Sequence, residues 1–216
     1  MPSNDSPADG TTRRRALGAL GTALAGGLAG CAGRVPGAGP VEMDAETTAE
    51  PGELQWQYPP REGDRDGVGY ASIDTDRRER AGSRPPVLGL RFNATVGDIA
   101  ASEPYRGYET DWFRFSVRPP RSYEGRLNYE MRVQPPGQWE EFGAYYDIEA
   151  GTRTFTTELR SVDTEGTIIV PAVFDPGVEA LPESLYCTFT VQASRSGPLG
   201  KTVRASDDGT LELDAE

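Results

Sequence analysis

An acidic segment near the start of the chain has the spacing of a cation-binding loop. Glu62, Asp64 and Asp66 place carboxylates at alternate positions ahead of Gly67. An EF-hand loop would also need a bidentate Glu at its twelfth position, and Ile73 stands there. Two interpretations stay open: a looser calcium site between strands, or a plain acidic turn.

A single cysteine, Cys187, is the nucleophile candidate of the folded part. Leu185, Cys187 and Phe189 occupy alternate positions, and this spacing puts them on the same face of a strand, the one expected to point into the core. A reactive thiol needs exposure and a positive neighbourhood. We therefore expect Cys187 to be a small buried hydrophobe.

An aromatic segment is the candidate binding surface. Residues 103–112 mix acids with Tyr105, Tyr108 and Trp112. Such rings stack on sugars or dock a partner; the alternative is that they cover one end of the core.

The absence of histidine limits the catalytic chemistry. A blue-copper site takes two histidines and a cysteine, and Ser-His-Asp triads and histidine-ligated zinc or haem also need imidazole. Carboxylates are too numerous for any pair to be informative, and no nucleophile elbow or phosphate loop is present. We expect no enzyme and no cofactor; the alternative is a carboxylate-based hydrolase acting on surface glycans.

The elements that must position these residues are strands. Apolar residues alternate with polar ones in short runs separated by turn residues, and no helix is strongly indicated. The alternating sets are Leu54, Trp56 and Tyr58; Leu88, Leu90 and Phe92; Phe113, Phe115 and Val117; Leu127, Tyr129, Met131 and Val133; Phe142, Ala144, Tyr146 and Ile148; Phe155, Thr157 and Leu159; and Leu185, Cys187, Phe189 and Val191. This pattern predicts an all-β fold, a two-sheet antiparallel β-sandwich of immunoglobulin-like architecture. Pro171 predicts an edge position or a bulge within the apolar run 166–174.

The N-terminal residues have the order of an export signal. Arg13, Arg14 and Arg15 precede a short stretch rich in Gly, Ala and Leu that ends at Cys31. The arginines resemble the twin-arginine signal, and Leu28-Ala29-Gly30-Cys31 resembles the lipobox of lipoproteins. This resemblance implies cleavage before Cys31, lipidation of its sulfur and attachment to the outer face of the membrane. We expect a signal peptide in residues 1–30, a flexible linker in 31–53 and the sandwich domain in 54–216.

The charge pattern bears on the partners. The chain carries 22 Lys and Arg against 34 Asp and Glu, a net charge of −12, and Lys201 is its single lysine. An acidic exported lipoprotein that prefers arginine resembles haloarchaeal surface proteins, because high salt screens its self-repulsion. Nucleic acid is not an expected partner, since no basic patch is visible. Asn93-Ala94-Thr95 is a glycosylation sequon that we expect on a loop after the strand ending at Phe92.

These observations together favour a lipid-anchored extracellular module of the cell envelope. Its expected role is to bind another envelope protein, a surface glycan or a small ligand.

Overall fold

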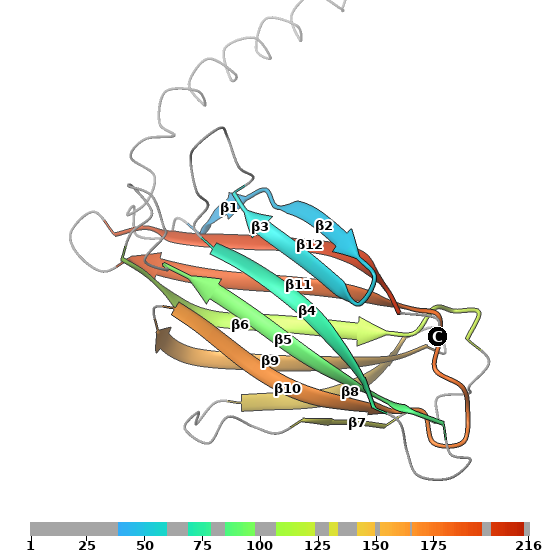
Figure 1. The fold of residues 1–216 in the computed structure, drawn as a ribbon. Helices are drawn as coiled ribbons and strands as arrows, with labels where there is room; N and C mark the ends of the chain where they lie inside the picture. The colour runs from blue at the N-terminus through green and yellow to red at the C-terminus, as the bar shows by residue number, and fades with distance from the viewer. Residues whose placement is uncertain are drawn as a thin grey trace, which may run out of the picture. The chain divides into compact units, whose positions relative to one another are not determined.

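The computed structural model describes residues 39–59, 69–78, 85–97, 107–123, 130–133, 142–149, 152–164, 166–195 and 200–213. These residues form twelve strands in two six-stranded sheets that lie one over the other (Figure 1). The predicted all-β sandwich of immunoglobulin-like architecture is confirmed.

The first sheet, here called sheet A, has the strand order β1-β12-β11-β6-β9-β8. Its strands are β1 (Val41–Met43), β6 (Tyr108–Arg118), β8 (Phe142–Glu149), β9 (Thr152–Thr164), β11 (Ser184–Arg195) and β12 (Thr202–Glu212). All neighbours run antiparallel except β1, which pairs with β12 in parallel.

The second sheet, sheet B, has the order β2-β3-β4-β5-β10-β7 and is antiparallel throughout. Its strands are β2 (Glu46–Glu50), β3 (Glu53–Tyr58), β4 (Gly69–Arg78), β5 (Val87–Val96), β7 (Glu130–Val133) and β10 (Gly166–Asp175).

The core is built from the apolar phase of the central strands. β11 alternates buried and half-buried residues along almost its whole length, and Cys187 is among the buried ones. Phe189 of β11 packs across the gap between the sheets on Trp56, with ring centroids 4.8 Å apart, and on Tyr58 at 5.8 Å. The period-two pattern therefore identified the core strands correctly, because side chains of alternate residues point to opposite faces of a sheet.

The segment expected to be a linker contains regular structure. β1 and β2 lie within 31–53, and β2 pairs with β3 along its full length. The expected boundary at residue 54 is therefore wrong. All five side chains of β2 are exposed, so this edge strand carries no apolar alternation. It is held by backbone pairing with β3 and by a 2.6 Å hydrogen bond from Thr47 Oγ1 to Asp207 Oδ2 of β12.

The strand over 142–149 also differs from expectation. Ile148 is 62% exposed and Ala144 is exposed, although both share the predicted inward phase with Tyr146. β8 is the edge of sheet A, and the corresponding edge strand of sheet B, β7, has only four residues. Among the residues that the structure describes, the four of β7 cover only part of the eight-residue strand β8, and alternation predicts burial only where the opposite sheet covers the strand.

Pro171 lies in a strand with neighbours on both sides, since β10 sits between β5 and β7. The pairing of β10 with β7 spans Ala172 to Asp175. Pro171 is paired with Arg91 of β5 on one side. The position beyond Val133 that would face it on the other side lies outside the described residues, so the edge position or bulge stays a prediction.

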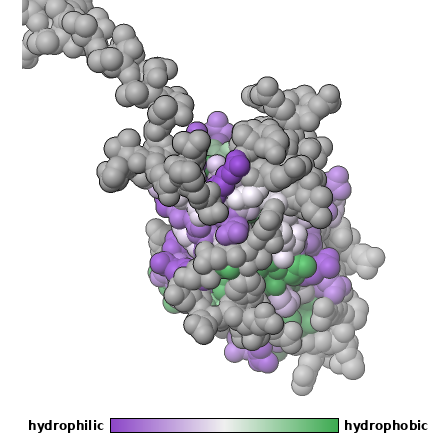
Figure 2. Space-filling model, turned by 90° about the vertical axis from the view of Figure 1, so that its left-hand side faces the viewer, coloured by the Kyte–Doolittle hydropathy of each residue, from purple (hydrophilic) through white to green (hydrophobic). Residues whose placement is uncertain are grey.

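Figure 2 shows one face of the described residues, on which hydrophilic side chains surround a smaller hydrophobic area. Among the residues that the structure describes, none forms a helix long and apolar enough to cross a membrane.

Candidate functional site

Several residues singled out in the sequence lie outside the described residues. They are the export signal with Arg13, Arg14 and Arg15, the lipidation candidate Cys31, the calcium candidates Glu62, Asp64 and Asp66, and Tyr105.

The two described rings of the aromatic segment have different environments. Tyr108 begins β6 and is 5% exposed as part of the core, so of the two interpretations this ring follows the one in which it covers the core and not the one in which it forms a binding surface. Trp112 is half-buried and lies on the outer face of sheet A. The pairing of β6 with β9 shifts register between Thr110 and Trp112. This irregularity at Asp111 changes the phase of the strand and turns Trp112 outward.

Trp112 lies among guanidinium groups. The guanidinium carbons of Arg114 and Arg204 are each 5.8 Å from the centroid of the indole ring, within the range of a cation–π contact. Arg204 Nη2 donates a 3.0 Å hydrogen bond to Gln192 Oε1, and Gln192 Nε2 donates at 3.2 Å to Asp111 Oδ2. The ring is thus held by polar side chains from β6, β11 and β12.

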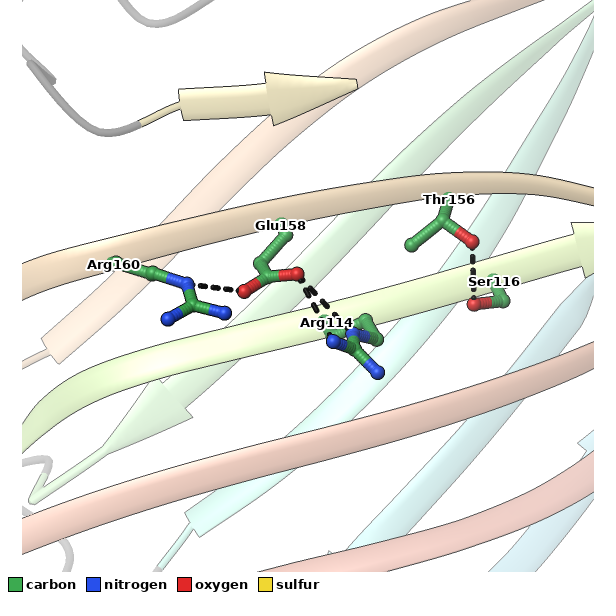
Figure 3. A network of polar contacts seen from close by, with 5 residues as sticks. All are labelled: Arg114, Ser116, Thr156, Glu158 and Arg160. Carbon is green, nitrogen blue, oxygen red and sulfur yellow. Dashed lines mark hydrogen bonds and ion pairs between the residues drawn. The ribbon is translucent and has the colours of Figure 1, made fainter. Parts of the chain in front are cut away.

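Next to Trp112 is a carboxylate shared by two arginines, shown in Figure 3. The Glu158 side chain is 9% exposed, while the exposed fractions of Arg114 and Arg160 are 43% and 63%. Arg114 donates to Glu158 Oε2 from Nη2 at 3.1 Å and from Nε at 3.3 Å. Arg160 Nε donates to the other oxygen, Oε1. We call Arg114, Glu158 and Arg160 the Glu158 cluster.

The strand register brings this cluster together. Glu158 of β9 is opposite Arg114 of β6, and one step along the same face Thr156 is opposite Ser116. The hydroxyls of Ser116 and Thr156 are hydrogen-bonded at 2.9 Å. Directly opposed side chains on one face of an antiparallel pair are close enough to interact. The Arg114–Glu158 and Ser116–Thr156 pairs therefore hold β6 and β9 together through side chains on the outer face of sheet A.

A shallow depression of about 310 Å³ opens over the Glu158 cluster. Its lining residues are Phe142, Gly143, Tyr145, Glu158 and Arg160. Gly143 of β8 is opposite Glu158 in the register, and because glycine has no side chain, the position opposite Glu158 on β8 contributes none to the depression. Tyr145 is 45% exposed. The depression thus combines an aromatic ring, a fixed carboxylate and a guanidinium.

A larger groove of about 730 Å³ lies over β4, β5, β7 and β10 of sheet B. Its charged lining residues are Asp76, Arg91, Arg132 and Asp175, and its apolar part includes Val87, Pro171 and Val173. Arg132 donates to Glu130 at 2.7 Å, and this bond raises the pKa of Arg132 above its usual value. The groove has the volume of a small-molecule site, and of its charged residues Arg91 and Arg132 are exposed while Asp175 is half-buried.

The glycosylation sequon does not lie on a loop. Asn93 is 8% exposed in the middle of β5, which continues to Val96. Its amide nitrogen donates to Ser72 Oγ at 3.0 Å and to Asp74 Oδ2 at 2.5 Å. The expected loop position is wrong, because strand pairing with β4 and β10 extends past Phe92. The atom that would carry a glycan is engaged within the sheet.

Cys187 is buried with no exposed surface, and burial raises the pKa of its thiol. Among the described residues, no three His, Cys, Asp or Glu side chains are placed to hold a metal ion.

The sequence did not single out the Glu158 cluster. Arg114 and Glu158 are 44 residues apart, and each looks like an ordinary polar residue on the solvent side of a strand. The available signal was their shared polar phase with Ser116 and Thr156, which cannot identify the partner strand.

Comparison with known proteins gives fold likeness only. No family model matches the chain, and no curated protein matches it. Among solved structures it is similar to AvmM, described as catalysing macrocyclization in alchivemycin A biosynthesis, at 12% identity and a TM-score of 0.35, covering 67% of this chain and 89% of that one. It is similar to AggA, the major subunit of aggregative adherence fimbriae type I from Escherichia coli, at 11% identity and a TM-score of 0.33, covering 67% and 94%. It is also similar to the collagen-binding domain of a Staphylococcus aureus adhesin, at 6% identity and a TM-score of 0.31, covering 65% and 96%. Likeness at this level carries no argument about function.

Proposed function

We propose that this chain is an exported, lipid-anchored binding module of the cell envelope, and that it binds its partner on the outer face of sheet A. The observation that carries the proposal is the Glu158 cluster beneath an open depression. A buried carboxylate that holds two arginines fixes their positions before a ligand arrives, and such preorganisation reduces the entropy that binding costs. Beside it, Trp112 and Tyr145 offer aromatic surface, which is enriched at interfaces.

A variant that fills the depression tests this site. Gly143→Val adds a branched side chain opposite Glu158, in a strand that accepts such residues. A Cβ on Gly143 would approach only the Glu158 carbonyl oxygen, at 3.9 Å, so the variant is expected to fold. The matched control is Val178→Thr, at a side chain that is 86% exposed.

The measurement is cross-linking of the full chain in living cells at native salt, followed by purification on a C-terminal tag. We expect an envelope component that is captured by the unmodified chain and by Val178→Thr but lost with Gly143→Val. Capture of the same components by all three chains would refute the site on sheet A.

The anchor is tested separately. Substitution Cys31→Ser removes the sulfur to which the lipid would be attached, and we expect the protein to move from the membrane fraction into the medium. Full membrane retention of the variant would contradict the anchor.

The alternative function, a carboxylate-based hydrolase of surface glycans, would use the groove on sheet B, where Asp76 and Asp175 both contribute to the lining. The two residues belong to β4 and β10, with β5 between them. Hydrolysis of an envelope glycan that is abolished by Asp76→Asn or Asp175→Asn would establish this alternative, and unchanged glycan would remove it.

A further inference from the structure

The Glu158 cluster contains more positive than negative charge. Two guanidiniums share one carboxylate, on a chain whose net charge is −12. Arg204, which also contacts the Trp112 ring, is 3.8 Å from Glu42 and adds no net charge, so the excess is that of Arg114 and Arg160 over Glu158. A cation excess at a fixed place on an acidic protein favours an anionic ligand there.

The bonds within the cluster leave donors for such a ligand. Arg160 contacts Glu158 through Nε, and its side chain is 63% exposed. Among the residues that the structure describes, its two terminal amino groups make no further hydrogen bond or ion pair, which leaves them available at the surface of the depression. Arg114 is also 43% exposed. A planar guanidinium held by a carboxylate presents its remaining N–H groups as a fork that matches the oxygens of a carboxylate or a sulfate.

The rest of the depression suits a sugar ring. Tyr145 offers a partly exposed aromatic ring, and Phe142 is a second aromatic residue of the lining. A pyranose has a flat face of C–H groups that packs on an aromatic ring, while its hydroxyls need acceptors and donors at the rim. The volume of about 310 Å³ is at the lower limit of small-molecule sites, which accommodates a terminal or single residue of a longer chain.

We infer that the depression over Glu158 binds an acidic saccharide, with a carboxylate or sulfate group of the sugar on Arg160 and the sugar ring against Tyr145. This inference rests on the proposed function, because it names the ligand class of the same site. Glu158 does not contact the acidic group; it holds Arg114 and Arg160 in place.

The test compares matched ligands on the full chain, purified with its anchor in detergent. The probes are tetragalacturonate, its methyl ester, which is the same sugar without charge, and a sulfated tetrasaccharide. Binding is measured by calorimetry over a series of salt concentrations. We expect at least one of the two acidic probes to bind at least tenfold more tightly than the ester, with an affinity that falls as salt increases. The carboxylate and sulfate probes then distinguish the two sources of charge.

The variant Arg160→Gln is expected to weaken binding of the preferred acidic probe at least tenfold, equivalent to about 1.4 kcal/mol. Arg118→Gln is the matched control, because Arg118 is an arginine of the neighbouring strand β6 and stacks on Tyr186, with its guanidinium carbon 4.1 Å from that ring. Unchanged thermal melting of both variants shows that the fold is intact.

Equal affinity for the acid and the ester, or equal loss in both variants, would overturn the inference. The outcomes also separate it from the proposed function. If no saccharide binds while Gly143→Val still abolishes capture in cells, the module stands and its ligand is not an acidic sugar. If no acidic saccharide binds and Gly143→Val does not abolish capture in cells, both proposals are refuted.

Discussion

The hydroxyl of Tyr146 bridges the edges of the two sheets at the backbone of Met131. Tyr146 Oη accepts a hydrogen bond from the Met131 N–H and donates one to the Met131 carbonyl at 3.0 Å. Tyr146 belongs to β8, the edge of sheet A, and Met131 to β7, the edge of sheet B. One side chain thus makes the contacts that a neighbouring strand would make and protects an edge from pairing with another chain.

We expect Tyr146→Phe to lower the free energy of unfolding by about 1–2 kcal/mol, because the Met131 N–H and carbonyl both lose a partner. Amide exchange at Met131 should also become faster. Tyr145→Phe is the matched control, since it removes the same atom from the neighbouring residue, which is 45% exposed. Equal effects of the two substitutions in urea unfolding would contradict the bridge.

The buried thiol of Cys187 should make the folded state less stable as the pH rises. Burial raises the pKa of Cys187 above its usual 9.0 and that of Tyr58 above its usual 10.0. Both groups are neutral at low pH in the folded and unfolded chains. Above pH 9 the unfolded thiol ionises while the folded one does not, so stability is lost as pH rises, by about 1.4 kcal/mol per pH unit for each group.

Cys187→Ala should remove the part of this decline that begins near pH 9 and leave the part that begins near pH 10. The measurement is urea unfolding at constant ionic strength between pH 7 and pH 10.5. In the folded chain at pH 8, Cys187 should also resist alkylation until denaturant is added. Rapid labelling of the native protein would show that the thiol is accessible.

The contact of Phe189 with Trp56 and Tyr58 should dominate the packing between the sheets. We expect Phe189→Ala to cost about 3–5 kcal/mol, because it removes a fully packed aromatic ring and leaves a cavity. Val178→Ala, at a side chain that is 86% exposed, should change stability by less than about 0.5 kcal/mol. A cost for Phe189→Ala below that of an ordinary surface substitution would mean that the core can collapse around the gap.

Gly69 should not accept a side chain. A Cβ placed on Gly69 would clash with the Thr95 carbonyl oxygen in β5. We expect Gly69→Ala to force β4 away from β5 and to destabilise by at least about 1–3 kcal/mol. Gly143→Ala is the control, since the atom nearest to a Cβ there, the Glu158 carbonyl oxygen, would be 3.9 Å away. Thermal melting of the two variants side by side decides the matter, and equal melting temperatures would contradict the expected clash.

The amino-acid sequence determined the fold class and most of the core. Alternation placed Trp56, Phe113 and Phe189 on inward faces, and all three are buried. That inference works because a strand has a period of two wherever one face is covered and the other is in water. It also identified Cys187 as buried, from its phase alone.

The tertiary structure decided the features that depend on which strands are neighbours. β2 has no apolar pattern, so the sequence gives no sign that it pairs with β3. The sequence also predicts a loop at Asn93, whereas pairing with β4 and β10 extends β5 to Val96. The irregular register near Asp111 turned Trp112 outward and left Tyr108 in the core. The Glu158 cluster is also a feature that depends on which strands are neighbours. Alternation specifies the face on which Arg114 and Glu158 lie, whereas strand order and register specify that they meet, and those are set by long-range backbone pairing.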